Sequence, residues 1–174
     1  MSCSRIIALA FTLCLFPSVG ADAQPAKQAS PKMNTIALPS PPAGKGQIVF
    51  FRGAGGGAVM GCSVNENGQK VSSLGNGRYF IMVTDPGRHE FTVKSEAKDV
   101  LALELEPDET QFVECRIKMG ILVGRPDLAP ATEEGFRKKR KLKMVDVDDM
   151  GPGLGALRPE DVEAALDGPG NPTE

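Results

Sequence analysis

The sequence of 174 residues has few aromatic residues and a single histidine. Aromatic residues make up 5% of the chain, with no tryptophan and one tyrosine, Tyr79. Because sugar-binding surfaces usually stack aromatic rings on pyranose faces, this composition disfavours a carbohydrate-binding module. His89 shares one face of a predicted strand with Phe91 and Val93. We therefore expect it to be partly buried rather than available for zinc binding or nucleophilic catalysis.

An excess of one charge and reactive cysteine motifs are also lacking. The 20 basic and 22 acidic residues nearly cancel, so the composition gives no case for nucleic-acid binding. No Cys-x-x-Cys pair is present, which disfavours a redox catalyst. Gly53, Gly55 and Ala58 are spaced like part of a dinucleotide fingerprint, but a strand rather than a helix is predicted after them. We expect no enzyme activity, no catalytic residue, no metal ligand and no cofactor.

Long apolar runs are absent except near the N-terminus. A positive charge precedes an apolar run from Ile6 to Phe16, and Ala21-Asp22-Ala23 offers the small residues that signal peptidase requires. The run is shorter than the roughly 20 residues that a membrane span needs. We expect a signal peptide over residues 1–23, cleaved near Ala23, and an exported protein that is periplasmic or secreted. Lipid anchoring at Cys14 is disfavoured because bulky residues precede it.

Three segments follow the signal peptide. Residues 24–43 contain five prolines among small and polar residues, which predicts a disordered linker. Residues 44–145 carry turn signals at intervals of about 8–12 residues, typical of all-β folds. We expect an antiparallel β-sandwich of about seven strands, of the Ig-like or prealbumin-like kind. Residues 146–174 are acidic and rich in glycine and proline, which predicts a loosely attached tail with a short helix over 159–166.

Local patterns predict individual elements of this fold. The apolar run over residues 47–51 predicts a strand that is buried on both faces. Asn67-Gly68 favours a type I′ turn, which would join residues 60–66 to residues 69–74 as a hairpin. A short helix is predicted over residues 132–141, although Gly135 weakens it.

Three short blocks of the sequence carry a resemblance to a known family. They are Phe50-Phe51-Arg52, Asp85-Pro86-Gly87-Arg88-His89 and Met119-Gly120-Ile121-Leu122-Val123-Gly124-Arg125-Pro126. Together they resemble the bacterial domain-of-unknown-function family numbered 2846, over about Gly44 to Val145. The resemblance implies a small exported or envelope-associated β-sandwich and supplies no activity and no catalytic residues. Typical members often carry large residues where this chain has Gly53-Ala54-Gly55-Gly56-Gly57, so we expect that loop to be remodelled.

Two cysteines remain once residues 1–23 are removed, Cys62 and Cys115. Each lies in a predicted strand with its side chain on the apolar side. An oxidising compartment permits a disulfide, and the alternative is a pair of buried thiols that act as small hydrophobic residues. The sequence leaves both open, because it does not give the Cα separation that a disulfide requires.

A basic run is the strongest local charge feature. It consists of Arg137, Lys138, Lys139, Arg140, Lys141 and Lys143. Such a run is suited to weak contact with anionic lipid headgroups at a membrane surface or with a cell-wall polymer. The alternative is an exposed helix or edge strand that lysines protect from aggregation.

These observations favour a non-catalytic exported protein of the bacterial envelope that acts as an interaction or structural module. We expect its partner to be another envelope protein and not nucleic acid. The alternative is a periplasmic module that binds a ligand beside the loop at residues 53–57, or an anionic surface through the basic run. An interaction module predicts an exposed apolar patch or an open sheet edge, whereas ligand binding predicts a pocket with converging polar groups.

Overall fold

The computed structural model describes residues 32–55, 60–93, 99–119, 124–152 and 155–168. The predicted signal peptide and residues 24–31 of the predicted linker lie outside the described residues. So do residues 56–59 of the glycine-rich loop, residues 120–123 of the last resemblance block, and residues 169–174 of the predicted tail.

The described residues form a mostly β protein, which confirms the all-β prediction. The strands are β1 (Gly46–Arg52), β2 (Cys62–Glu66), β3 (Gln69–Leu74), β4 (Arg78–Thr84), β5 (Gly87–Val93), β6 (Asp99–Leu105), β7 (Thr110–Met119), β8 (Gly124–Ala131) and β9 (Lys143–Met144). The helices are α1 (Glu133–Lys138), α2 (Pro159–Asp167) and the short 3-10 helix η1 (Val147–Asp149). The predicted helix over 132–141 is therefore shorter than expected, and the predicted helix over 159–166 is present as α2.

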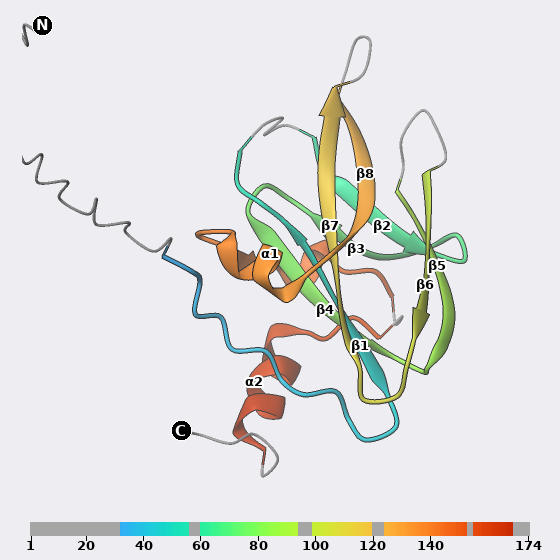
Figure 1. The fold of residues 1–174 in the computed structure, drawn as a ribbon, viewed down its shortest axis with the longest axis vertical. Helices are drawn as coiled ribbons and strands as arrows, with labels where there is room; N and C mark the ends of the chain where they lie inside the picture. Colours follow the sequence, from blue (N-terminus) through green and yellow to red (C-terminus); the bar gives the residue numbers. More distant parts are fainter. Residues whose placement is uncertain (1–31, 56–59, 94–98, 120–123, 153–154, 169–174) are drawn as a thin grey trace, which may run out of the picture. The chain divides into compact units, whose positions relative to one another are not determined.

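The strands form two sheets, with the orders β8-β7-β1-β4-β9 and β3-β2-β5-β6 (Figure 1). The prediction of about seven antiparallel strands is wrong in number and in direction. The described residues contain nine strands, and β1 pairs with β7, and β4 with β9, in parallel. Turn signals reveal only connections between consecutive strands, whereas these parallel pairs join strands that are distant in the sequence. Pro126 and Pro130 also hide β8, which tolerates them because it is an edge strand.

The local patterns at β1 and at the first hairpin are confirmed. Every residue of β1 is buried, because alternate side chains point to opposite faces of the sheet and both faces are covered. The β2 and β3 strands pair as an antiparallel hairpin. Asn67 and Gly68 have φ values of 49° and 80°, the positive values that a type I′ turn requires at both central positions.

Two apolar clusters hold the fold together. Between the sheets, the Phe50 ring stacks on Phe80 at 4.8 Å and meets Phe91 edge-on at 5.0 Å. The second cluster covers the other face of the five-stranded sheet, where Phe136 of α1 and Val162 of α2 pack against that face. This packing against the sheet explains why α1 forms, although so short a helix is only marginally stable in isolation.

The C-terminal segment is not the loosely attached tail that its composition predicts. Gly151 donates its N–H to the Val71 carbonyl at 2.8 Å, and Val83 donates to the Gly155 carbonyl at 2.8 Å. Val162 is 5% exposed. The composition gave the wrong prediction because these contacts use backbone groups and a few widely spaced apolar side chains, among them Met150, Leu157 and Val162, so they do not require a continuously apolar segment.

Residues 32–43, which we name the strap, also differ from the predicted disordered linker. They contain no strand or helix, but Ile36 and Leu38 pack in the second cluster. Asn34 donates its N–H to the Arg137 carbonyl at 2.7 Å. Proline prevents regular structure without preventing an extended segment from binding to the surface of the protein.

Candidate functional site

Three of the four sheet edges in the described part of the chain are blocked against an added strand. The β8 edge contains Pro126 and Pro130, which lack a backbone N–H. The β9 edge has two residues, one of them Lys143. The β3 edge is covered by the segment around Met150, which forms a bridge with Ser72. Such features are the usual ways in which proteins prevent edge-to-edge association.

The β6 edge is the exception. Its seven residues form a ladder with β5 alone among the described strands. Among the described residues outside β5, Gln111 binds a backbone group of β6, since it donates its side-chain N–H to the Glu104 carbonyl at 2.7 Å. The strand contains no lysine or proline. It therefore offers backbone donors and acceptors on its outer side.

The side chains of β6 give the edge an apolar and acidic character. Val100 is 53% exposed, and Ala102 and Glu104 on the same face are also exposed. On the opposite face Leu101 and Leu103 are half-buried against the core. Between residues 99 and 115 the chain carries six acidic residues and no lysine or arginine. A strand that pairs with β6 would therefore contact apolar side chains, and the acidic residues nearby would give its surroundings a negative electrostatic potential.

Cys62 and Cys115 form a disulfide, with a Cα separation of 6.6 Å. Cys62 lies in β2 and Cys115 in β7, so the bond joins the two sheets. Of the two alternatives that the sequence leaves open, the structure therefore has the bonded one. Because the residues are 0% and 2% exposed, the bond is structural rather than accessible for exchange.

His89 is partly buried at the start of β5, as expected, but its partners are polar. Its Nδ1 lies 2.6 Å from Glu66 Oε1, and its Nε2 lies 2.8 Å from the Asp85 carbonyl oxygen. Burial by itself lowers the pKa of His89, but the hydrogen bonds to these oxygens and the charges of Glu66 and Asp85 outweigh it and raise the pKa above its ordinary value. Both ring nitrogens thus face acceptors, which suits a cationic imidazolium.

The six predicted anionic-surface residues do not form one free patch. Three of them are in ion pairs, which are Arg137–Glu133, Lys138–Glu134 and Lys139–Glu114. Arg140, Lys141 and Lys143 are exposed and have no ion pair with another described residue. The basic run is therefore split into a neutralised half at α1 and an exposed half after it.

A depression of about 240 Å³ lies beside the described part of the glycine-rich loop. Arg52, Arg116 and Lys139 line it together with Glu114. Burial alone raises the pKa of Glu114, but hydrogen bonds from Lys139 and Arg116 and their charges hold that pKa below its ordinary value. Because the carboxylate binds two of the three cations, the depression is a poor site for an anion.

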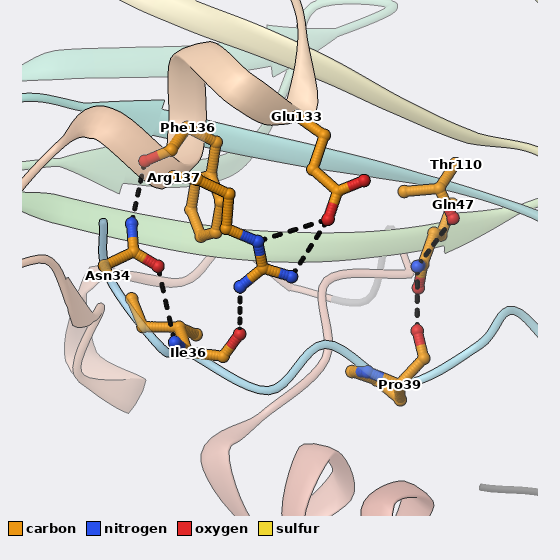
Figure 2. Close-up of polar contacts among 8 residues, drawn as sticks. All are labelled: Asn34, Ile36, Pro39, Gln47, Thr110, Glu133, Phe136 and Arg137. Atoms are coloured by element: carbon orange, nitrogen blue, oxygen red, sulfur yellow. Dashed lines mark hydrogen bonds and ion pairs between the residues drawn. The ribbon is translucent and has the colours of Figure 1, made fainter. Parts of the chain in front are cut away.

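The strap encloses a second depression that the sequence did not predict (Figure 2). Asn34 donates its side-chain N–H groups to the carbonyls of Phe136 and Lys139 at 2.7 and 2.9 Å, at the C-terminus of α1. Arg137 donates to the Ile36 carbonyl and Gln47 to the Pro39 carbonyl. A signal was present in the sequence, since Gln47 is a polar residue in a strand predicted to be buried on both faces.

Metal-binding clusters and membrane-spanning helices are both absent from the described residues. No group of three or more His, Cys, Asp or Glu side chains there is placed to hold a metal ion. None of the helices in that part of the chain has the length and apolar character to cross a membrane.

No protein-family model matches the chain, and no curated protein or solved structure is significantly similar to it. The resemblance to the domain-of-unknown-function family therefore stays a prediction. The function must be inferred from the geometry of the protein itself.

Proposed function

We propose that the chain is a non-catalytic, exported interaction module of the bacterial envelope, built as a β-sandwich of the Ig-like or prealbumin-like kind. Its partner is another envelope protein, which adds an extended segment to the β6 edge. The observation that supports this proposal is that β6 remains open while the other three described edges are blocked. Strand addition supplies main-chain hydrogen bonds along the edge, and alternate side chains supply specificity.

The surroundings of β6 define the chemistry of the segment that fits. Val100 and Ala102 present apolar surface on the outer face, and apolar cross-strand neighbours would cover it. Glu104 on that face and the acidic turn after β6 favour basic residues in the partner. We therefore expect an extended segment in which apolar residues alternate with lysine or arginine.

Export is supported by two independent features. Residues 1–23 have the charge, apolar run and small residues of a signal peptide. The disulfide between Cys62 and Cys115 is of the kind that persists in oxidising compartments such as the periplasm.

Site-specific photo-crosslinking in the native envelope tests the proposal. A photoreactive residue at position 100 is compared with one at position 147, because Val100 and Val147 are similarly exposed, at 53% and 47%, and only Val100 lies on β6. We expect position 100 to crosslink to an alternating apolar and basic segment of one envelope protein, and position 147 to give no such product. The product should disappear when Ala102→Lys introduces a repulsive charge to a basic partner.

Two outcomes would contradict strand addition. Equal crosslinking at positions 100 and 147 would mean that β6 is not the contact. A partner that binds equally well after Ala102→Lys would mean that the outer face of β6 does not define the interface.

The second candidate function is binding to an anionic surface, which the exposed cations Arg140, Lys141 and Lys143 favour. Co-sedimentation with vesicles rich in phosphatidylglycerol tests it. Substitution of all three residues by glutamine should abolish sedimentation, and Val100→Lys should not reduce it. Sedimentation that is unchanged in the triple variant would remove this candidate.

A further inference from the structure

The depression under the strap differs from an ordinary surface hollow because a buried polar side chain faces it. It has a volume of about 390 Å³ and lies between residues 38–41 of the strap and the covered face of the five-stranded sheet. Gln47 is 2% exposed and contributes to the lining. Figure 2 shows its side chain extending between Thr110 and Pro39 of the strap.

The amide of Gln47 is only half used within the described part of the protein. Nε2 donates to the Pro39 carbonyl and to Thr110 Oγ1, both at 2.8 Å. Oε1 is buried and has no hydrogen-bond partner among the described residues. Buried carbonyl groups are nearly always paired, because they lose their hydrogen bonds to water on burial. The oxygen is therefore the unsatisfied acceptor nearest the depression, and because it is buried, a donor that enters the depression reaches it through a small shift of the Gln47 side chain.

The charged groups of the lining also favour a donor, and one that is positively charged. Asp108 accepts the Gly44 N–H through one carboxylate oxygen at 2.8 Å, and the carboxylate has a second oxygen. Glu133 accepts from Arg137 at 3.0 and 3.1 Å. Arg137, the one cation of this lining, is also bound to the Ile36 carbonyl, so it is not available to hold an anion. Two carboxylates and one arginine leave the lining with a net negative charge.

The remaining lining is mainly apolar, with Ser40 and Thr110 as its other polar residues. Leu38, Pro39, Pro41 and Phe112 contribute to it, and Phe112 is 9% exposed. A ligand that satisfies the whole lining therefore combines an apolar stem with a compact cationic donor. Guanidinium groups are planar and wide, whereas an ammonium group has three donors on one atom and can reach a single buried oxygen.

We propose that the depression under the strap binds a primary ammonium group on a short aliphatic stem. The ammonium donates to Gln47 Oε1 and lies near the carboxylates of Asp108 and Glu133, while the stem contacts Leu38 and Phe112. The same chemistry is present in a free alkylamine and in the lysine side chain of a polypeptide. The site is distinct from the β6 edge, because its strand residues Gln47, Thr110 and Phe112 belong to the other sheet, and it shares with the surroundings of β6 only Asp108 of the turn after that strand.

Titration with n-pentylamine and with Nα-acetyl-lysine amide, followed through the side-chain amide NMR signals of Gln47, tests the proposal. We expect saturable shifts at Gln47 at millimolar concentrations or below, roughly the affinity expected of so small a ligand. Tighter binding of the lysine derivative would identify a polypeptide as the source, and tighter binding of pentylamine a free amine. 1-Pentanol and pentanoate, which share the stem and lack the ammonium, should not shift Gln47. Equal shifts with either of them, or no shift with either amine up to about 20 mM, would overturn the proposal.

Asp108→Asn supplies the matched variant. It keeps an acceptor for the Gly44 N–H and tolerates the φ of 61° at this position, because asparagine adopts left-handed conformations more readily than most residues. We expect pentylamine to bind about fivefold more weakly, a loss typical of one partly exposed charge. Asp148→Asn, at an exposed residue of η1, should leave the affinity unchanged. Unchanged binding in Asp108→Asn, or equal weakening in both variants, would refute the assigned site.

Discussion

Removal of the disulfide should destabilise the protein by an amount that follows from its place in the chain. Cys62 and Cys115 are 53 residues apart in the sequence. In the chain-entropy model, a closed loop of that size lowers the entropy of the unfolded chain by about 14 cal/mol/K, or about 4 kcal/mol at 25 °C. Both cysteines are buried, so replacement by alanine also leaves small voids that add to the loss. Domains of this kind have unfolding free energies of roughly 5–15 kcal/mol, so the change is a large fraction of the total.

Urea denaturation of the oxidised protein and of the Cys62→Ala/Cys115→Ala variant measures this loss. We expect the free energy of unfolding to fall by about 4–5 kcal/mol and the dependence on urea to steepen, because the unfolded chain without the crosslink exposes more surface. A reducing agent should destabilise the oxidised protein and leave the double variant unchanged. A loss below about 1 kcal/mol would refute the loop-closure reasoning. Free thiols in denatured but unreduced protein would refute the bond itself.

Two further predictions concern a titrating side chain and a glycine. Because the folded pKa of His89 is raised, its stabilising contribution is complete below the unfolded pKa of about 6.5 and is lost as pH rises through the folded value. The stability difference between the wild type and His89→Gln, measured by urea denaturation, should therefore shrink from about pH 5.5 to about pH 9, and a difference that grows with pH would contradict this. Gly155→Ala should destabilise by more than about 1 kcal/mol, because φ is +74° and the new Cβ would lie 2.1 Å from the Val83 carbonyl oxygen. Gly61→Ala, where a Cβ meets nothing within 4 Å, serves as the control in the same thermal denaturation experiment, and equal melting temperatures for the two variants would refute the assigned contact.

The β6 edge illustrates which features of the candidate site can be predicted from the sequence. The alternation of Leu101, Leu103 and Leu105 predicts a strand whose leucines face the core, and β6 is present there, with Leu105 buried and the other two leucines half-buried against the core. Its position at the end of a sheet depends on which strands pair, and pairing between distant segments is not encoded in any local pattern. Neither the openness of β6 nor the blocking of β3 by the segment around Met150 is therefore visible in the sequence.

For the strap, the sequence predicts the local conformation but not the contacts with the rest of the protein. Five prolines in residues 24–43 correctly exclude a helix or strand in its described part, residues 32–43. Composition does not reveal that Asn34 binds the C-terminus of α1 or that Gln47 binds Pro39, because those partners lie 102 and 8 residues away along the chain. The depression beneath the strap exists only because these contacts hold the strap against the sheet.

The sequence by itself determined the features that depend on neighbours in the chain. These are the β-rich character, the buried strand at residues 47–51, the hairpin turn at Asn67-Gly68 and the short helix at α2, since periodicity, turn conformation and capping act over a few residues. Only the tertiary structure determined the parallel strand pairs, the disulfide between Cys62 and Cys115 and the division of the basic run. It also determined the packing of the strap and of the C-terminal segment against the sheets. Each of these depends on which distant surfaces meet, and that is determined by the packing of the whole core rather than by any local segment.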